Sequence, residues 1–276
     1  MTSSRSALVV IVLGALTAAL PSQAETPVAV TPPAASPDAG DLAQGEAALK
    51  RGDDAEALHF FTLASAAGNG EAENDLGVLY EAGRGVPRDD AQALHWYLLG
   101  AQHGNAWAQL NMGWHYNNGN GVPKDDAEAL RWYRLAAAQG NPFAEQNIGA
   151  FYANGQVVPR DYAEAIRWYR LAAAQGNPGS QTNLGSIYFY GHGVTQDYRE
   201  AMRWFRMATD QADHWANYPE PAVRRNIAVA QYHIGLMYAS GLGVPQDDAQ
   251  AHSWMTKAAQ QNISEATAWL AAHPAP

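Results

Sequence analysis

The chain has 276 residues, no cysteine and a formal net charge of −10 at pH 7. The absence of thiols excludes disulfides, cysteine zinc sites and cysteine nucleophiles. An acidic chain without a basic run is poorly suited to binding nucleic acid or an anionic membrane surface.

The first segment, residues 1–24, has the pattern of a secretory signal peptide. Arg5 gives a cationic start, a 14-residue apolar run covers positions 7–20, and Ser22 and Ala24 supply small residues for cleavage after Ala24. An uncleaved anchor is the alternative, but the run is shorter than the roughly 20 residues that span a bilayer. We therefore expect a cleaved signal and a periplasmic or secreted protein.

Residues 25–40 are rich in proline and alanine, which predicts an extended linker. No other long apolar segment follows, so we expect no membrane insertion after signal cleavage.

The strongest pattern in the rest of the chain is an internal repeat. Three residue types recur in one register, with spacings of 36, 36, 36 and 50 residues. They are Trp96, Trp132, Trp168, Trp204 and Trp254; Gly77, Gly113, Gly149, Gly185 and Gly235; and Tyr80, Tyr116, Tyr152, Tyr188 and Tyr238. The last spacing indicates a 14-residue insertion between the fourth and fifth units.

Each unit predicts two helices. In the first, Ala72, Leu76 and Tyr80 recur at helical spacing and give helix A an apolar face. A glycine turn then ends helix A, and Asp89 or Asp90 begins helix B as an N-cap. Two such helices cannot bury their apolar faces alone, so the units must stack.

The pattern resembles the Sel-1-like repeat family, a branch of the tetratricopeptide-type solenoids. Its Leu-Gly-x-x-Tyr, Gly-x-Gly-Val and Asp-x-x-x-Ala-x-x-Trp-Tyr elements recur here five times, with departures at Val157, Thr195 and Met255. The resemblance implies an all-α fold, a right-handed α-α superhelical solenoid of about six helix pairs plus a closing helix. The five units over 70–272 lie near 71–105, 106–141, 142–177, 178–226 and 227–262, and the closing helix covers 263–272.

Residues 41–69 are interpreted as an atypical, tetratricopeptide-like first unit. Phe60 lies 36 residues before Trp96, but the Gly-x-Gly-Val-Pro turn is missing. Terminal units that differ from the middle ones are typical of solenoids.

The resemblance also implies a concave face lined by the non-framework side of helix A. In the second unit, Trp107, Leu110 and Trp114 share one helical stripe, with Asn117 and Asn118 beyond them. Aromatic anchors beside amides are typical of peptide-binding surfaces. The alternative is that the two tryptophans pack against the next helix A. By register, the same face includes Phe143, Gln146, Phe189, Tyr190 and Tyr232.

The insertion, residues 212–225, is a second candidate contact site. Pro219 and Pro221 predict an irregular loop, which carries Trp215 and Tyr218 beside the paired Arg224 and Arg225. A tolerated loop without a role is the alternative.

Other chemistry is poorly supported by the residue pattern. Acidic pairs such as Asp89–Asp90 lack the alternating spacing of calcium loops and suit helix capping. The nine histidines form no metal-ligand motif, and no GxSxG, SxxK or phosphate-binding glycine motif occurs. We therefore expect no cofactor, no metal and no catalytic site.

The predicted function is a non-catalytic scaffold, adaptor or regulator that binds a partner protein or peptide. One alternative is a cell-wall-related, β-lactamase-like enzyme, because some cysteine-rich relatives carry that activity; this chain lacks their cysteines. The other is non-catalytic binding of peptidoglycan or another glycan through exposed tryptophans.

Overall fold

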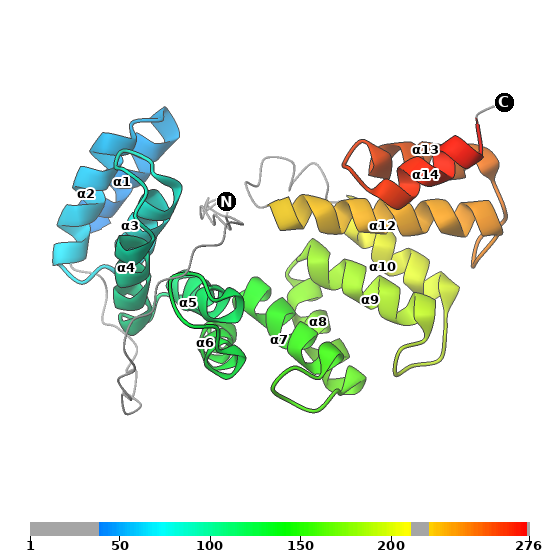
Figure 1. The fold of residues 1–276 in the computed structure, drawn as a ribbon, viewed down its shortest axis with the longest axis horizontal. Helices are drawn as coiled ribbons and strands as arrows, with labels where there is room; N and C mark the ends of the chain where they lie inside the picture. The colour runs from blue at the N-terminus through cyan, green and yellow to red at the C-terminus, as the bar shows by residue number, and fades with distance from the viewer. Residues whose placement is uncertain (1–38, 211–220, 275–276) are drawn as a thin grey trace. The chain divides into compact units, whose positions relative to one another are not determined.

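The structure is a computed structural model that describes residues 39–210 and 221–274. These ranges contain thirteen α-helices and no strand (Figure 1). The helices are α1 (Ala39–Arg51), α2 (Asp54–Ala66), α3 (Gly70–Ala82), α4 (Asp90–Gln102), α5 (Ala106–Asn118), α6 (Asp126–Ala138), α7 (Pro142–Asn154), α8 (Tyr162–Ala174), α9 (Pro178–Tyr190), α10 (Tyr198–Asp210), α12 (Pro221–Ser240), α13 (Asp248–Ala259) and α14 (Ser264–Ala272). The predicted all-α solenoid of helix pairs is confirmed.

Side-chain caps begin the helices of both kinds. Asp89 Oδ1 accepts hydrogen bonds from the backbone N–H groups of Ala91 and Gln92, both at 3.0 Å. Asp125 caps α6 and Asp247 caps α13 in the same way. Helix A is capped by an asparagine instead. Asn69, for example, caps the start of α3. The acidic pairs therefore act as helix caps, as their position predicted.

The recurrent Gly of helix A and the aromatic residue after the recurrent Trp of helix B form a packing pair. A Cβ on Gly113 would lie 2.6 Å from ring atoms of Tyr133, and one on Gly149 would lie 2.7 Å from those of Tyr169. Only glycine lets the two helices approach this closely, which explains why the two residue types recur together.

The same pair occurs in the atypical first unit. A Cβ on Gly45 would lie 2.4 Å from the ring of Phe61. The helices α1 and α2 therefore keep the central contact of the repeat, although only Gly52 and Asp53 connect them.

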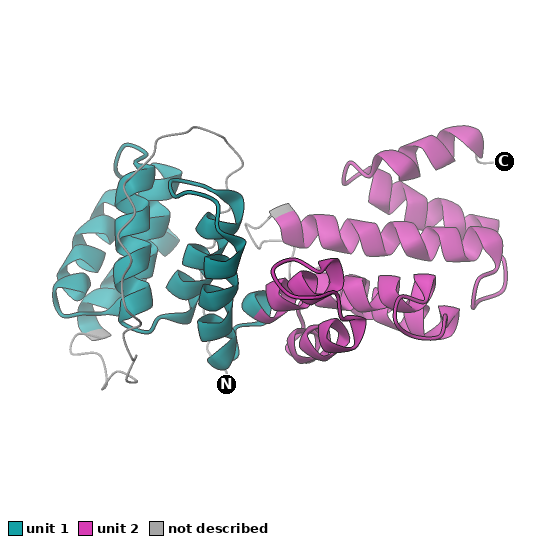
Figure 2. Cartoon of the chain, turned by 60° about the horizontal axis from the view of Figure 1, so that its bottom comes forward, with its two compact units in different colours: residues 1–144 teal, residues 145–276 magenta. Residues whose placement is uncertain are grey.

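The chain divides into two compact units, residues 1–144 and 145–276 (Figure 2). In unit 1, Phe61, Leu76 and Leu79 form one apolar cluster, and Tyr97 and Met112 belong to a second. Each cluster contains residues of successive helix pairs, so the core is continuous in the manner of a stacked repeat.

The described residues of unit 2 also form such clusters. They centre on Leu184 beside α8 and α10, on Phe205 and Ile234 between α10 and α12, and on Met255 and Ile263 between α12, α13 and α14. Trp269 packs against the last cluster, so α14 closes the apolar face of the final pair, as predicted.

The helix α12 corrects the prediction of an irregular loop for residues 221–225. It begins at Pro221 and is 20 residues long, whereas α9 and α10 have 13 each. Proline is tolerated in the first helical turn because the N–H that it lacks has no partner there. Pro221 therefore begins a helix, and Arg224 and Arg225 lie on it. Trp215, Tyr218 and Pro219 lie outside the described residues.

Candidate partner-binding surface and pocket

The helix α5 is the only helix A among the described residues that carries tryptophan. Trp107 and Trp114 are both half-buried. The ring of Trp107 lies 5.6 Å from that of Phe143, the second residue of α7, at an angle of 46°. The ring of Trp114 meets His115 edge-on, with centroids 5.1 Å apart. The ring of Trp107 therefore packs against a residue of the next helix A, whereas the ring of Trp114 contacts the residue that follows it in the chain.

The polar residues beyond these rings use their amide donors locally. Asn117 Nδ2 donates to Asp126 Oδ1 at 2.9 Å, and Asn118 Nδ2 donates to the carbonyl of Trp114 at 2.9 Å. These two groups hold the end of α5 in place. Each amide NH2 group has a second N–H, so the interpretation of Asn117 and Asn118 as partner-binding residues stays a prediction.

Two residues predicted to lie on the binding face are buried. Leu110 is 5% exposed, and Phe189 is 8% exposed inside the cluster that contains Phe205. Their side chains are not available to a partner. The register placed them on one side of helix A, but it did not show what covers that side.

The remaining predicted residues of unit 2 differ in exposure. Tyr190 is 54% exposed, and its ring stacks at 5.6 Å on His192. Tyr232 is half-buried against the cluster around Met255. Gln146, also half-buried, lies with its amide oxygen close to Gly179. Of these residues, Tyr190 offers the largest free surface.

A buried polar group that the sequence analysis missed lies beside Trp114. Glu81 Oε2 accepts a hydrogen bond of 2.7 Å from the hydroxyl of Tyr97, and Glu81 Oε1 lies 3.8 Å from His115 Nε2. His115 Nδ1 lies 2.8 Å from the carbonyl of Asn120. Burial lowers the pKa of His115, and the hydrogen bond to Asn120 opposes that shift. The network holds the imidazole against which Trp114 rests.

A second missed feature is a hydrogen bond within a helix pair that joins residues 30 positions apart. We call it the latch. Among the described residues the latches are Glu73–His103 at 2.7 Å, Gln109–Gln139 at 2.9 Å, Glu145–Gln175 at 2.9 Å and Gln231–Gln261 at 2.7 Å. In the first three, a residue in the first turn of helix A meets one at the end of helix B, and in the fourth Gln231 lies in the middle of α12. The recurrence of Glu or Gln with the period of the repeat was the signal that would have found it.

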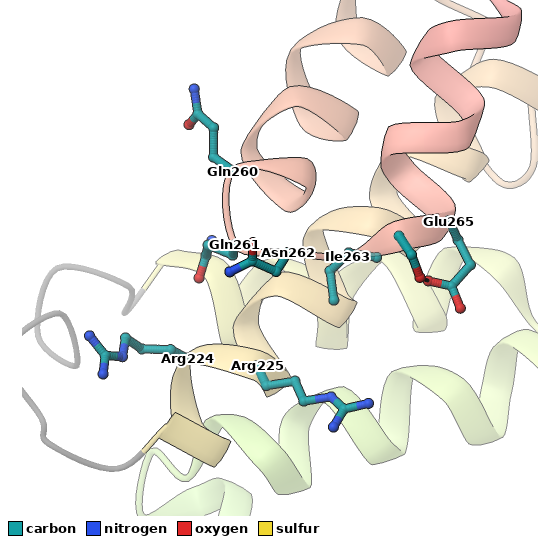
Figure 3. A pocket seen from close by; sticks show the side chains of 8 residues that line it. Arg224, Arg225, Gln260, Gln261, Asn262, Ile263 and Glu265 are labelled. Carbon is teal, nitrogen blue, oxygen red and sulfur yellow. Dashed lines mark hydrogen bonds between the residues drawn. The ribbon is translucent and has the colours of Figure 1, made fainter.

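A pocket lies in unit 2 between the start of α12 and the connection from α13 to α14 (Figure 3). Its lining includes both members of the predicted basic pair, Arg224 and Arg225, which are exposed. Opposite them is the polar stretch 260–265. The sequence analysis found the arginines but not the residues that face them, because the two segments are brought together only by helix packing.

No group of three or more potential metal ligands occurs within residues 39–210 and 221–274. No helix in those ranges is both long and apolar enough to cross a membrane. His59 and His95, one repeat apart, each contact the ring that follows them, Phe60 and Trp96. They act as packing residues of helix B.

Comparisons with known proteins agree on one family. The model of the Sel1 repeat matches six segments, 41–69, 70–105, 108–141, 142–177, 178–213 and 228–263. These include the segment interpreted as an atypical first unit. No curated protein gives a significant match.

Several solved structures share the fold. A Sel1 repeat protein from Oxalobacter formigenes is 32% identical, with a TM-score of 0.69 over 82% of this chain and 86% of its own. A protective antigen with an SLR fold, present in uropathogenic Escherichia coli strains, is 31% identical, with a TM-score of 0.59 over 84% of this chain and 56% of its own. An immunity protein of Pseudomonas aeruginosa, 18% identical with a TM-score of 0.53 over 82% of this chain and 83% of its own, shares the fold alone. With six repeats matched and two relatives above 30% identity, the chain belongs to the Sel1 repeat family.

Proposed function

We propose that the protein is an exported, non-catalytic scaffold that holds a partner protein or peptide on the surface formed by Trp107, Trp114 and Phe143. Sel1 repeat proteins are generally protein–protein interaction scaffolds. Membership of the family therefore supports a role in protein binding. The residues of this chain support the proposed position of the binding surface.

The observation that carries the proposal is the partial exposure of three aromatic side chains at one place in unit 1. Trp107 and Phe143 pair across α5 and α7, and Trp114 lies on the same stripe of α5 as Trp107. Aromatic residues with one buried edge and one free face are enriched among the residues that dominate binding energy, because they cover a large area at a small entropic cost.

The buried network beside Trp114 adds rigidity to this surface. His115, which Trp114 contacts edge-on, is itself held by Asn120 and lies close to Glu81. A ring with a fixed neighbour loses less freedom when a partner covers it, so preorganisation favours binding there.

Export rests on the amino-terminal pattern. The cationic start, the apolar run and the small residues before Glu25 support a cleaved signal and a periplasmic or secreted location. The chain also lacks the cysteines of relatives with cell-wall enzyme activity, which favours a binding role over hydrolysis.

Crosslinking in the producing cell tests the proposal. A photo-crosslinking residue at Trp114 should capture a defined partner, whereas one at Leu98, a 38% exposed residue of α4, should not. The variant Trp107→Ala/Trp114→Ala should abolish capture from a probe at Phe143 while the melting curve stays cooperative. Equal capture from Leu98 and Trp114 would contradict the proposed surface. Loss of the folded state in the double variant would show that the rings serve packing instead.

A further inference from the structure

The pocket of Figure 3 is lined by two positively charged side chains and one negatively charged side chain. Arg224 and Arg225 line it from the first turns of α12, and Glu265 lines it from the first turn of α14. Gln261 and Asn262 follow along the connection from α13, and the Gln260 side chain points away from the arginines (Figure 3).

The two arginines have no ion pair with any described residue, unlike many arginines of this chain. Arg131, Arg167 and Arg203, for example, each pair with a glutamate three positions earlier in their own helix. In a chain with a net charge of −10, an adjacent pair of arginines without such partners is an uncommon positive patch.

The segment that faces the arginines departs from the repeat. Four units end with Gly-Asn, and the asparagine caps the next helix A. Here the same two positions hold Asn262, with a φ of 64°, and Ile263, which gives α14 no side-chain cap. The first turn of α14 therefore has no cap from the preceding residue, and it lies in the lining of a cavity that also contains two guanidinium groups.

The carboxylate of Glu265 shows how the surroundings of the pocket affect a negatively charged group. Glu265 Oε2 accepts a hydrogen bond of 3.0 Å from the hydroxyl of Ser264. A backbone hydrogen bond, the contact with Ser264 and the charge of Arg225 lower the pKa of Glu265. The surroundings thus favour the ionised form of a carboxyl group.

We propose that this pocket binds an acidic segment of a partner protein, in which two carboxylates pair with Arg224 and Arg225. The two side chains extend to different sides of the pocket in Figure 3, so each guanidinium takes a carboxylate of its own. The side chain of Asn262 lies in the same lining and can bond to the peptide backbone. The inference rests on the proposed function as a protein-binding scaffold, but it assigns a separate site in unit 2.

The test uses the full-length chain and a fluorescein-labelled hexaglutamate peptide, with hexaglutamine as the neutral control, measured by fluorescence anisotropy. We expect Arg224→Ala/Arg225→Ala to weaken hexaglutamate binding about tenfold or more, since two charge-assisted contacts are lost. The matched control is Arg160→Ala/Arg199→Ala, which removes the same charge from two exposed arginines of unit 2 without ion pairs and should change the affinity less than about twofold. Glu265→Gln should tighten binding, because it removes the competing carboxylate.

Equal losses in the two double variants, or equal binding of hexaglutamate and hexaglutamine, would overturn the proposal. Displacement of hexaglutamate by an equal concentration of inorganic phosphate would overturn the assignment to a protein segment. Failure of the wild-type chain to bind hexaglutamate, together with intact crosslinking at Trp114, would contradict this inference alone. Binding of hexaglutamate by the wild-type chain without crosslinking at Trp114 would contradict only the surface of unit 1.

Discussion

The two compact units are built from one repeat but differ in the polar groups that they bury. In α3 of unit 1, Glu73 has His103 as its latch partner and Glu81 lies near His115. In unit 2 the positions that correspond to Glu73 and His103 hold Glu145 and Gln175 in one helix pair and Gln231 and Gln261 in another. Phe189 takes the place of Glu81 in α9. The repeat therefore fixes which positions pack together, while their charge is free to vary.

The largest expected difference concerns the glycine of helix A in two particular helix pairs, one in each unit. In unit 1, Gly113→Ala would place a Cβ 2.6 Å from the rigid ring of Tyr133, which we expect to cost about 3 kcal/mol of unfolding free energy. In unit 2, Gly235→Ala meets the flexible Met255 at 3.0 Å and gains helix propensity, so its effect should stay within about 1 kcal/mol. Urea unfolding of both variants measures this, and equal losses would show that the two helix pairs are equally tight.

The buried tyrosine after the recurrent Trp gives the next comparison. Tyr97→Phe removes the hydroxyl that donates to Glu81 and leaves a buried carboxylate with one partner fewer, at a cost of about 2 kcal/mol. Tyr169 in unit 2 makes no such bond with a described residue, so Tyr169→Phe should be neutral within about 0.5 kcal/mol. The same unfolding measurement applies. A neutral Tyr97→Phe would mean that Glu81 is already protonated or solvated.

The smallest effect is a pH dependence carried by the latch. Burial raises the pKa of Glu73, and the bond to His103 partly offsets this. Ionising Glu73 thus costs stability as the pH rises from the ordinary pKa of a glutamate through the raised pKa of the folded state. We expect the wild type to lose about 0.5 kcal/mol between acidic and neutral pH through this group, and Glu73→Gln to lose that dependence.

The same dependence is expected in unit 2. Glu145 also has a pKa raised by burial and accepts a bond from Gln175. Glu145→Gln should therefore remove a pH dependence of similar size from unit 2. Unfolding curves of both variants at the two pH values test this, and an unchanged pH dependence of stability in either variant would show that the buried carboxyl group of that latch does not carry it.

Much of the fold was predictable because its signals are local and repeated. The periodic Trp, Gly and Tyr residues predicted the positions of the helices, and Asp89 caps α4 where its position predicted, whereas the cap by Asn69 was not predicted. The latch was missed because its partners lie 30 residues apart and vary in chemical type. The burial of Leu110 and Phe189 was missed because helical register gives the direction of a side chain but not the neighbouring residues that cover it. Pro221 was misinterpreted because a proline that interrupts a helix and one that begins a helix have the same sequence signal.

The latch also affects how such a chain can change in evolution. Both partners of each latch belong to one helix pair, so duplicating or deleting a 36-residue segment between equivalent positions would carry a whole latch with it. No half-satisfied polar group would be left in the flanking pairs. Changes in the number of repeats therefore cost little stability in this architecture. The length of the solenoid can accordingly change with the size of its partner.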